Sequence, residues 1–141
     1  MGPVTSLVRA TRDQLDHLTA HPDNINEFLL HDERRAPPSG YLDKSVDIIQ
    51  TALDASAVNV TSSPATFPGE PIATERGRTV FAIYPDKIRT IADAVAGLSR
   101  EEIGSRLHKS QRDYVMHYYD NLIRFLEHAA AHDYGVLISH G

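Results

Sequence analysis

The chain contains apolar segments typical of β-strands at its start, middle and end, and this constrains the fold more than any other feature. The three segments are Val4–Arg9, Arg78–Tyr84 and Gly135–Ser139. An unpaired strand would leave a row of backbone N–H and C=O groups without partners. We therefore expect the N-terminal, central and C-terminal segments to pair in one small, mostly antiparallel sheet.

Between these strands, apolar residues recur at the spacing of amphipathic helices. The predicted helices are one that follows Thr11, a short one after Pro22, Tyr41–Ser56, Pro85–Gly97, a short one after Ser99, and a long one from Ser110 to about Asp133. Helices in runs, rather than alternating singly with strands, are typical of α+β proteins. The sequence thus predicts an α+β fold, with a small sheet packed against several α-helices.

Three four-residue patterns predict where helices begin. Thr11–Gln14 and Ser99–Glu102 match the capping box, and Ser110–Asp113 starts the longest predicted helix. The apolar stripe of that helix includes Leu122 and Leu126, which we expect to be deeply buried.

Size and charge narrow the classes of protein to consider. The 141 residues suit one domain, 1–141, with its own core. Cysteine is absent and the start of the chain does not resemble a signal peptide, which favours a cytoplasmic protein. A net charge of −5 disfavours nucleic acid as a partner, and no segment has the length and apolarity of a membrane helix.

The residues from Ala57 to Thr79 form the least regular part of the chain. Prolines and glycines interrupt them, and a long irregular segment within a compact domain is often functional. If the protein binds a partner, we expect this segment to contribute to the surface, joined by Asp43, Lys44 and Asp47. The alternative is that the segment only connects neighbouring elements.

Two short groups of charged residues are candidate binding sites. Asp43, Lys44 and Asp47 are expected at the start of the predicted helix 41–56, where they form either a charged binding patch or ordinary helix-start electrostatics. Arg76 and Arg78 could present guanidinium groups to an anion.

The eight histidines raise the questions of metal binding and of catalysis. His17 and His21, like His128 and His132, are four residues apart, but each pair lacks further ligands nearby, so we predict no metal site and no cofactor.

The long predicted helix also carries His117, Asp120 and His128 on its polar side. A histidine near a carboxylate can act as a general base, so this side is a candidate hydrolase-like site. The same mixture of residues also suits the solvated face of any amphipathic helix, and no nucleophile motif accompanies it.

Several short motifs resemble those of the YfbM-like family, bacterial proteins with a domain of unknown function. Thr11–Leu15 resembles the family's first helix, Leu42–Lys44 its Leu-Asp-Lys motif, and Leu98–Glu102 a later helix start. The chain departs from the family pattern at Val46, where the family usually has tryptophan. The resemblance implies an α+β fold and a bacterial cytoplasmic protein, and it implies no reaction.

The sequence therefore leaves three functions open. An interaction module that binds a protein partner is favoured, because no catalytic motif is present. The alternatives are a small-ligand or anion-binding protein that uses Arg76 and Arg78, and a hydrolase-like enzyme that uses His117, Asp120 or His128.

Overall fold

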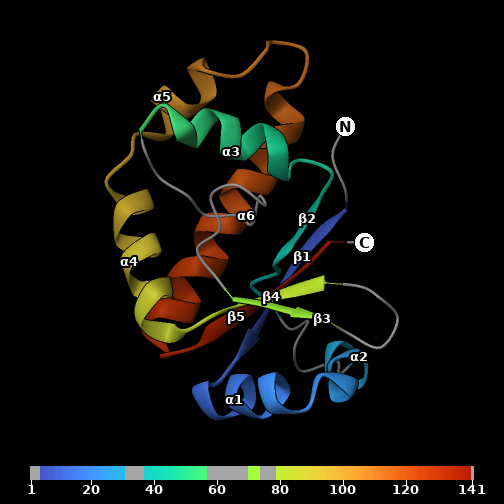
Figure 1. Cartoon of the computed structure of the whole chain (residues 1–141). Helices are drawn as coiled ribbons and strands as arrows, with labels where there is room; N and C mark the ends of the chain where they lie inside the picture. The colour runs from blue at the N-terminus through green and yellow to red at the C-terminus, as the bar shows by residue number, and fades with distance from the viewer. Residues whose placement is uncertain (1–3, 31–36, 57–69, 74–78, 141) are drawn as a thin grey trace.

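A five-stranded antiparallel sheet forms the middle of the protein, with the strand order β2-β1-β5-β4-β3 (Figure 1). The computed structural model describes residues 4–30, 37–56, 70–73 and 79–140. The strands are β1 (Thr5–Ala10), β2 (Tyr41–Asp43), β3 (Glu70–Ala73), β4 (Thr79–Ile83) and β5 (Gly135–His140). The predicted α+β fold is confirmed.

The two terminal strands lie side by side at the centre of the sheet. β1 pairs with β5 along its whole length, from Thr5 opposite His140 to Ala10 opposite Gly135. β5 pairs on its other side with β4. The predicted pairing of the first, central and last strands is therefore confirmed.

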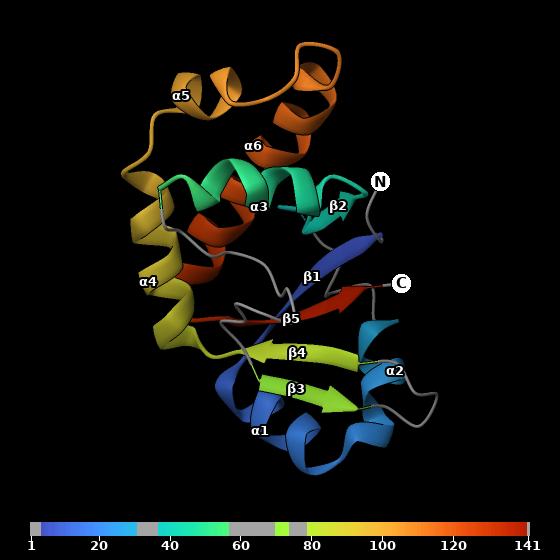
Figure 2. The same ribbon diagram turned by 45° about the horizontal axis from the view of Figure 1, so that its top comes forward.

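The helices cover both faces of this sheet (Figures 1 and 2). They are α1 (Arg12–Ala20), α2 (Ile25–Leu29), α3 (Val46–Asp54), α4 (Pro85–Ala96), α5 (Arg100–Ser105) and α6 (Arg112–Ala131), with a 3-10 turn η1 at Pro22–Asn24. The pair α1 and α2 packs on one face, and the helices from α3 to α6 gather on the other.

Alternating strand residues divide the core between the two faces. Leu7 and Ile138 point into the larger cluster beneath α3, α4 and α6, whereas Val8 and Leu137 point into the smaller one beneath α1 and α2. In the larger cluster, Leu122 and Leu126 of α6 are buried as predicted, with exposed fractions of 0% and 2%. The alternation holds the register, because a one-residue slip would exchange the two apolar sets.

The predicted helix over 41–56 is wrong in its first third. Tyr41–Asp43 forms β2, which pairs with β1, and α3 begins only at Val46. Asp43 has a φ of 50°, in the left-handed region that a right-handed helix cannot include. Leu42 is buried as the pattern required, but it reaches the core from a strand.

The predicted helix starts differ in accuracy. At α1 the capping box is complete, since the Gln14 N–H donates to Thr11 Oγ1 (3.2 Å) and the Thr11 N–H to Gln14 Oε1 (2.8 Å). Ser99 caps α5, accepting from the Glu102 N–H at 3.4 Å. The cap at Ser110 is wrong, because its hydroxyl lies 2.7 Å from His108 Nδ1 and Gln111 occupies the N-cap position.

The irregular region 57–79 contains a strand that the sequence did not predict. β3 (Glu70–Ala73) pairs only with β4 and lies at the edge of the sheet. An edge is where a strand accommodates a proline such as Pro71, which has no N–H to donate to a neighbour. Thr79 begins β4, and residues 57–69 and 74–78 lie outside the described residues.

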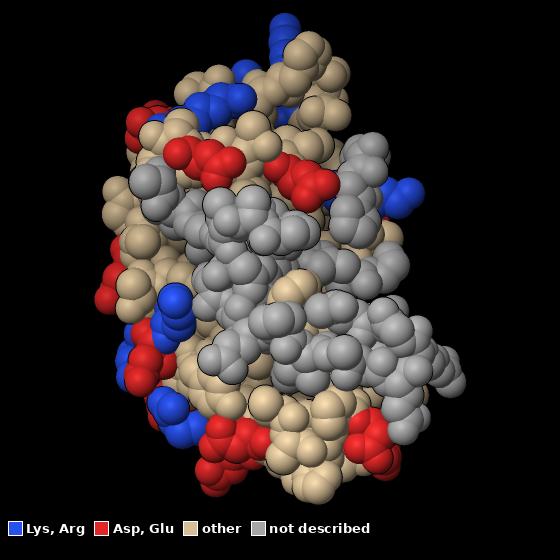
Figure 3. Space-filling model, viewed as in Figure 1, with Lys and Arg blue, Asp and Glu red and all other residues tan. Residues whose placement is uncertain are grey.

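Across the part of the chain that the structure describes, no helix combines the length and apolarity required to cross a bilayer. On the face seen in Figure 3, Lys and Arg are interspersed with Asp and Glu and do not form a basic stripe.

Gly40, directly before β2, provides a test of how closely this part of the chain packs on β1. The Leu7 N–H donates to the Gly40 carbonyl at 2.8 Å, and a Cβ at Gly40 would lie 2.1 Å from the Leu7 oxygen and 2.9 Å from Phe125 Cε2. We predict that Gly40→Ala lowers the free energy of unfolding by about 1–3 kcal/mol, the usual range for overpacking. Urea unfolding followed by circular dichroism measures this loss.

Gly97→Ala is the matched control for that experiment. A Cβ at Gly97 meets its nearest atom at an ordinary 3.6 Å, and the φ of −77° suits alanine. Its stability should stay close to that of the wild type. Equal stability of the two variants would show that the contact between Gly40 and β1 is looser than described.

Candidate binding surface

Three tyrosines from β2 and α6 form a cluster that reaches the surface. The rings of Tyr114 and Tyr118, one turn apart on α6, have centroids 5.1 Å apart in an edge-to-face arrangement. Tyr41 of β2 meets Tyr118 at 6.3 Å in the same type of arrangement. Tyr41 is 45% exposed, and with Leu30 it is one of two strongly exposed large apolar side chains among the described residues. We call Tyr41, Tyr114, Tyr118 and Asp43 the tyrosine surface.

Asp43 holds two of these tyrosines in position. Its carboxylate accepts from the Tyr114 hydroxyl at 2.7 Å and from the Tyr41 hydroxyl at 3.3 Å. The Tyr114 oxygen in turn accepts from the Lys44 backbone N–H at 3.4 Å. The tyrosine surface is therefore held by hydrogen bonds between β2 and α6, elements about seventy residues apart in the chain.

The electrostatics keep these hydroxyls as donors. Partial burial, together with the neighbouring charge and hydrogen bond of Asp43, raises the pKa of both Tyr41 and Tyr114 above the ordinary value of 10.0. Both phenols stay protonated at neutral pH and donate to the carboxylate.

The sequence-predicted binding residues are only partly brought together. Asp43 does not lie in the first turn of a helix, because α3 begins at Val46, so its expected interaction with the helix dipole is wrong. Lys44 and Asp47 are exposed nearby, and among the described residues no ion pair joins them. Arg76 and Arg78 both lie outside the described part of the chain.

Sequence reasoning missed the tyrosines as a group. Tyr41 is not among the candidate binding residues predicted from the sequence, and neither are Tyr114 and Tyr118, which lie four residues apart on the long helix. The four-residue spacing of these two tyrosines on a helix predicts that their rings meet. The contribution of Tyr41 could not be predicted, since it depends on β2 lying beside α6.

A second feature is a groove of about 430 Å³ between α4 and α6, near the start of α5. It is lined by Val95, Ala96, Leu98, Arg100, Tyr119, Asp120, Ile123, Arg124 and Glu127. Arg100 spans it with two hydrogen bonds to Asp120, both 2.9 Å. Arg124 donates to Asn121 at 3.0 Å.

The candidate hydrolase-like residues do not converge. Asp120 is engaged by Arg100, while the exposed His117 contacts the Tyr118 ring at 5.0 Å. His128 lies eleven residues beyond His117 on the same helix, roughly 16 Å along its axis. No single substrate bond could meet both histidines at hydrogen-bonding distance.

Each histidine pair has its two rings in contact. The centroids are 4.8 Å apart for His17 and His21, and 4.2 Å apart for His128 and His132. His132 Nδ1 donates to the His128 carbonyl at 2.8 Å. The described residues contain no cluster of three or more histidines, cysteines or carboxylates suited to a metal ion.

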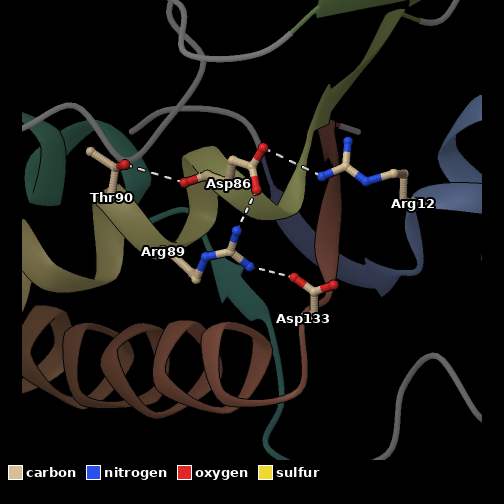
Figure 4. A network of polar contacts seen from close by, with 5 residues as sticks. All are labelled: Arg12, Asp86, Arg89, Thr90 and Asp133. Atoms are coloured by element: carbon tan, nitrogen blue, oxygen red, sulfur yellow. Dashed lines mark hydrogen bonds and ion pairs between the residues drawn. The ribbon is translucent and has the colours of Figure 1, made fainter.

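A network of exposed charges lies at the opposite end of α6 (Figure 4). Asp86 at the start of α4 contacts both Arg12 of α1 and Arg89, and Arg89 also contacts Asp133 in the turn before β5. Nearby, the Tyr84 hydroxyl donates to Asp16 at 2.7 Å. These contacts join the layers on either side of the sheet.

The comparisons with known proteins agree with this fold. A sequence model of the family described as "Domain of unknown function (DUF1877)" matches residues 1–139. The chain belongs to this family. Its structure is similar to the crystal structure of YfbM from Escherichia coli, a protein of unknown function, with a TM-score of 0.63 and 13% identity over 98% of this chain and 99% of that one.

The sequence identity to YfbM limits what can be inferred from the similarity of the two structures. At 13% identity the likeness to YfbM shows the fold alone. No curated protein matches the chain. The resemblance inferred from the sequence motifs is therefore confirmed as a family and as a fold.

His128 allows a test of the surroundings of the last turn of α6. Burial lowers the pKa of His128 below 6.5, and the neighbouring His132 and the buried Arg9 lower it further. A lowered folded-state pKa gives stability that is present above the unfolded-state pKa and lost as the pH falls through the folded-state pKa. We predict that His128→Gln reduces the fall in unfolding free energy between about pH 7 and about pH 5.

His117→Gln is the control, because His117 is an exposed histidine on the same helix. Urea unfolding of this variant over the same pH range shows how much of the effect comes from the loss of any histidine from α6. Identical slopes for wild type and His128→Gln would contradict the described surroundings of His128.

Proposed function

We propose that this protein is an interaction module of the bacterial cytoplasm, and that it binds a protein partner through the tyrosine surface. The observation that carries the proposal is Tyr41, which is 45% exposed while its hydroxyl is held by Asp43. Tyrosine is enriched among the residues that dominate binding energies at protein interfaces.

The preorganisation of the cluster supports this role. Binding normally costs about 0.5–1.5 kcal/mol for each flexible side chain that becomes immobilised. Tyr41 and Tyr114 are already held by hydrogen bonds to Asp43, and Tyr118 lies against both rings. A partner that docks here therefore orders little that is not ordered already.

The backbone around β2 favours docking through side chains rather than by addition of a strand. The Tyr41 N–H donates to Ser39 Oγ at 3.1 Å, and the Leu42 carbonyl accepts from both the N–H and the hydroxyl of Ser45, at 3.1 and 2.6 Å. Strand addition requires backbone groups that are open to the partner. Here the edge is three residues long and much of its backbone is engaged.

The groove between α4 and α6 supports a second candidate function, the binding of a small ligand. Its volume of about 430 Å³ lies within the range of ligand sites, and apolar and charged side chains both line it. A small-molecule screen by NMR, with Ile123→Ala as the variant, tests this candidate. Hits whose shifts cluster at the groove and disappear in Ile123→Ala would favour it over the interaction role.

The hydrolase-like alternative gains no support, because Asp120 is paired with Arg100 and the two histidines lie far apart on α6. The proposed anion site at Arg76 and Arg78 stays a prediction from the sequence.

The interaction role is tested by comparing affinity capture with wild type and with Tyr41→Ala. We predict that a protein retained by wild type is lost with Tyr41→Ala. With the purified partner, calorimetry should show affinity weakened at least about 30-fold, the effect of removing a hot-spot residue worth about 2 kcal/mol.

Leu30→Ala is the matched control, because Leu30 is 72% exposed and follows α2, away from the tyrosine surface. This variant should retain the partner. If Tyr41→Ala, shown by circular dichroism to be folded, retains the partner as well as Leu30→Ala does, then the tyrosine surface is not the docking site.

A further inference from the structure

Within the described residues, an arginine already lies over the ring of Tyr84. Tyr84 donates its hydroxyl to Asp16 at 2.7 Å, and the Arg12 guanidinium carbon lies 5.7 Å from the centre of the Tyr84 ring. This is the distance range of a cation–π contact. Within this chain, therefore, one tyrosine donates its hydroxyl to a carboxylate while its ring contacts a guanidinium.

The tyrosine surface repeats the phenol–carboxylate part of that arrangement. Tyr41 and Tyr114 both donate their hydroxyls to Asp43, and Tyr118 lies against both rings. Among the described residues, no Lys or Arg lies over any of these three rings, although Lys44 is close in sequence. Tyr41 keeps nearly half of its surface open to solvent.

The chemistry of this surface favours a cation. Aromatic rings carry negative charge on their faces, and a carboxylate hydrogen-bonded to the phenol adds to the attraction for a positive group. A carboxylate has about four acceptor sites, and the two phenols use two of them at Asp43. The net charge of −5 favours the approach of a basic partner.

We propose that the partner inserts an arginine side chain at the tyrosine surface, where its guanidinium stacks on Tyr41 and donates to Asp43. Arginine suits this site better than lysine, because its planar group can stack on a ring and donate to a carboxylate at the same time. This inference rests on the proposed interaction function and specifies the chemistry of the partner.

The first test needs no partner. The peptide acetyl-Gly-Arg-Gly-amide is titrated into the full chain, and the ring signals of the tyrosines are followed by NMR. We expect millimolar binding that moves the Tyr41 and Tyr118 signals, weaker binding of the lysine peptide, and none of the uncharged citrulline peptide. Equal shifts with the citrulline peptide, or no shifts with the arginine peptide, would overturn the proposal.

The second test uses the partner once it is captured. Tyr41→Leu keeps an apolar side chain of moderate size but removes the aromatic ring, whereas Tyr41→Phe keeps the ring and removes the hydrogen bond to Asp43. We expect Tyr41→Leu to weaken binding by about tenfold or more, and Tyr41→Phe to weaken it less. Equal affinity of Tyr41→Leu and wild type would overturn the arginine contact.

The two proposals can fail separately. In one outcome, a captured partner binds Tyr41→Leu as well as wild type but does not bind Tyr41→Ala. This result would support the interaction function and contradict the proposed arginine contact. Binding of the arginine peptide without any captured protein supports the cation site and contradicts the interaction function.

Discussion

The pairing of β1 with β5 is the interaction on which the rest of the structure depends. It joins the two ends of the chain along six opposed residue pairs and puts both strands at the centre of the sheet. Because side chains alternate along these strands, one ladder supplies both apolar faces, with Leu7 and Ile138 beneath α6 and Val8 and Leu137 beneath α1. Both helical layers therefore pack on a sheet whose centre is this long-range pairing.

The tyrosine surface is a consequence of how β2 joins that sheet. β2 adds to the outer side of β1, and its short length together with the left-handed Asp43 turns the chain at once toward α3. Aspartate is one of the few residues that tolerate this backbone conformation. The same residue accepts the two tyrosine hydroxyls, so one side chain both ends a strand and links it to α6. Replacing it would therefore disturb the surface through the backbone as well as through the lost hydrogen bonds.

Periodicity along the chain was sufficient to predict the terminal strands, the long helix and the burial of Leu122 and Leu126, because these depend on patterns within one element. It failed at Tyr41–Asp43, since Leu42 and Val46 have helical spacing and the competing pairing with β1 comes from residues far away in the sequence. The cap at Ser110 failed for a local reason, because its hydroxyl contacts the His108 ring instead. The tyrosine surface required both the position of β2 and that of α6, and neither the Asp43 contacts nor the exposure of Tyr41 has a signature in sequence spacing.

The adjacency of Thr5 and His140 has a mechanical consequence. A force that pulls the two ends of the chain apart acts across the β1–β5 ladder, along the direction of its hydrogen bonds. The load then falls on the outermost pair first and passes to the next only when that pair has opened. The ladder would unzip from Thr5 toward Ala10 instead of resisting with all its bonds together, as strands sheared along their length do. A sheet whose central strands carry the termini in this way resists tension on its ends with only one residue pair at a time.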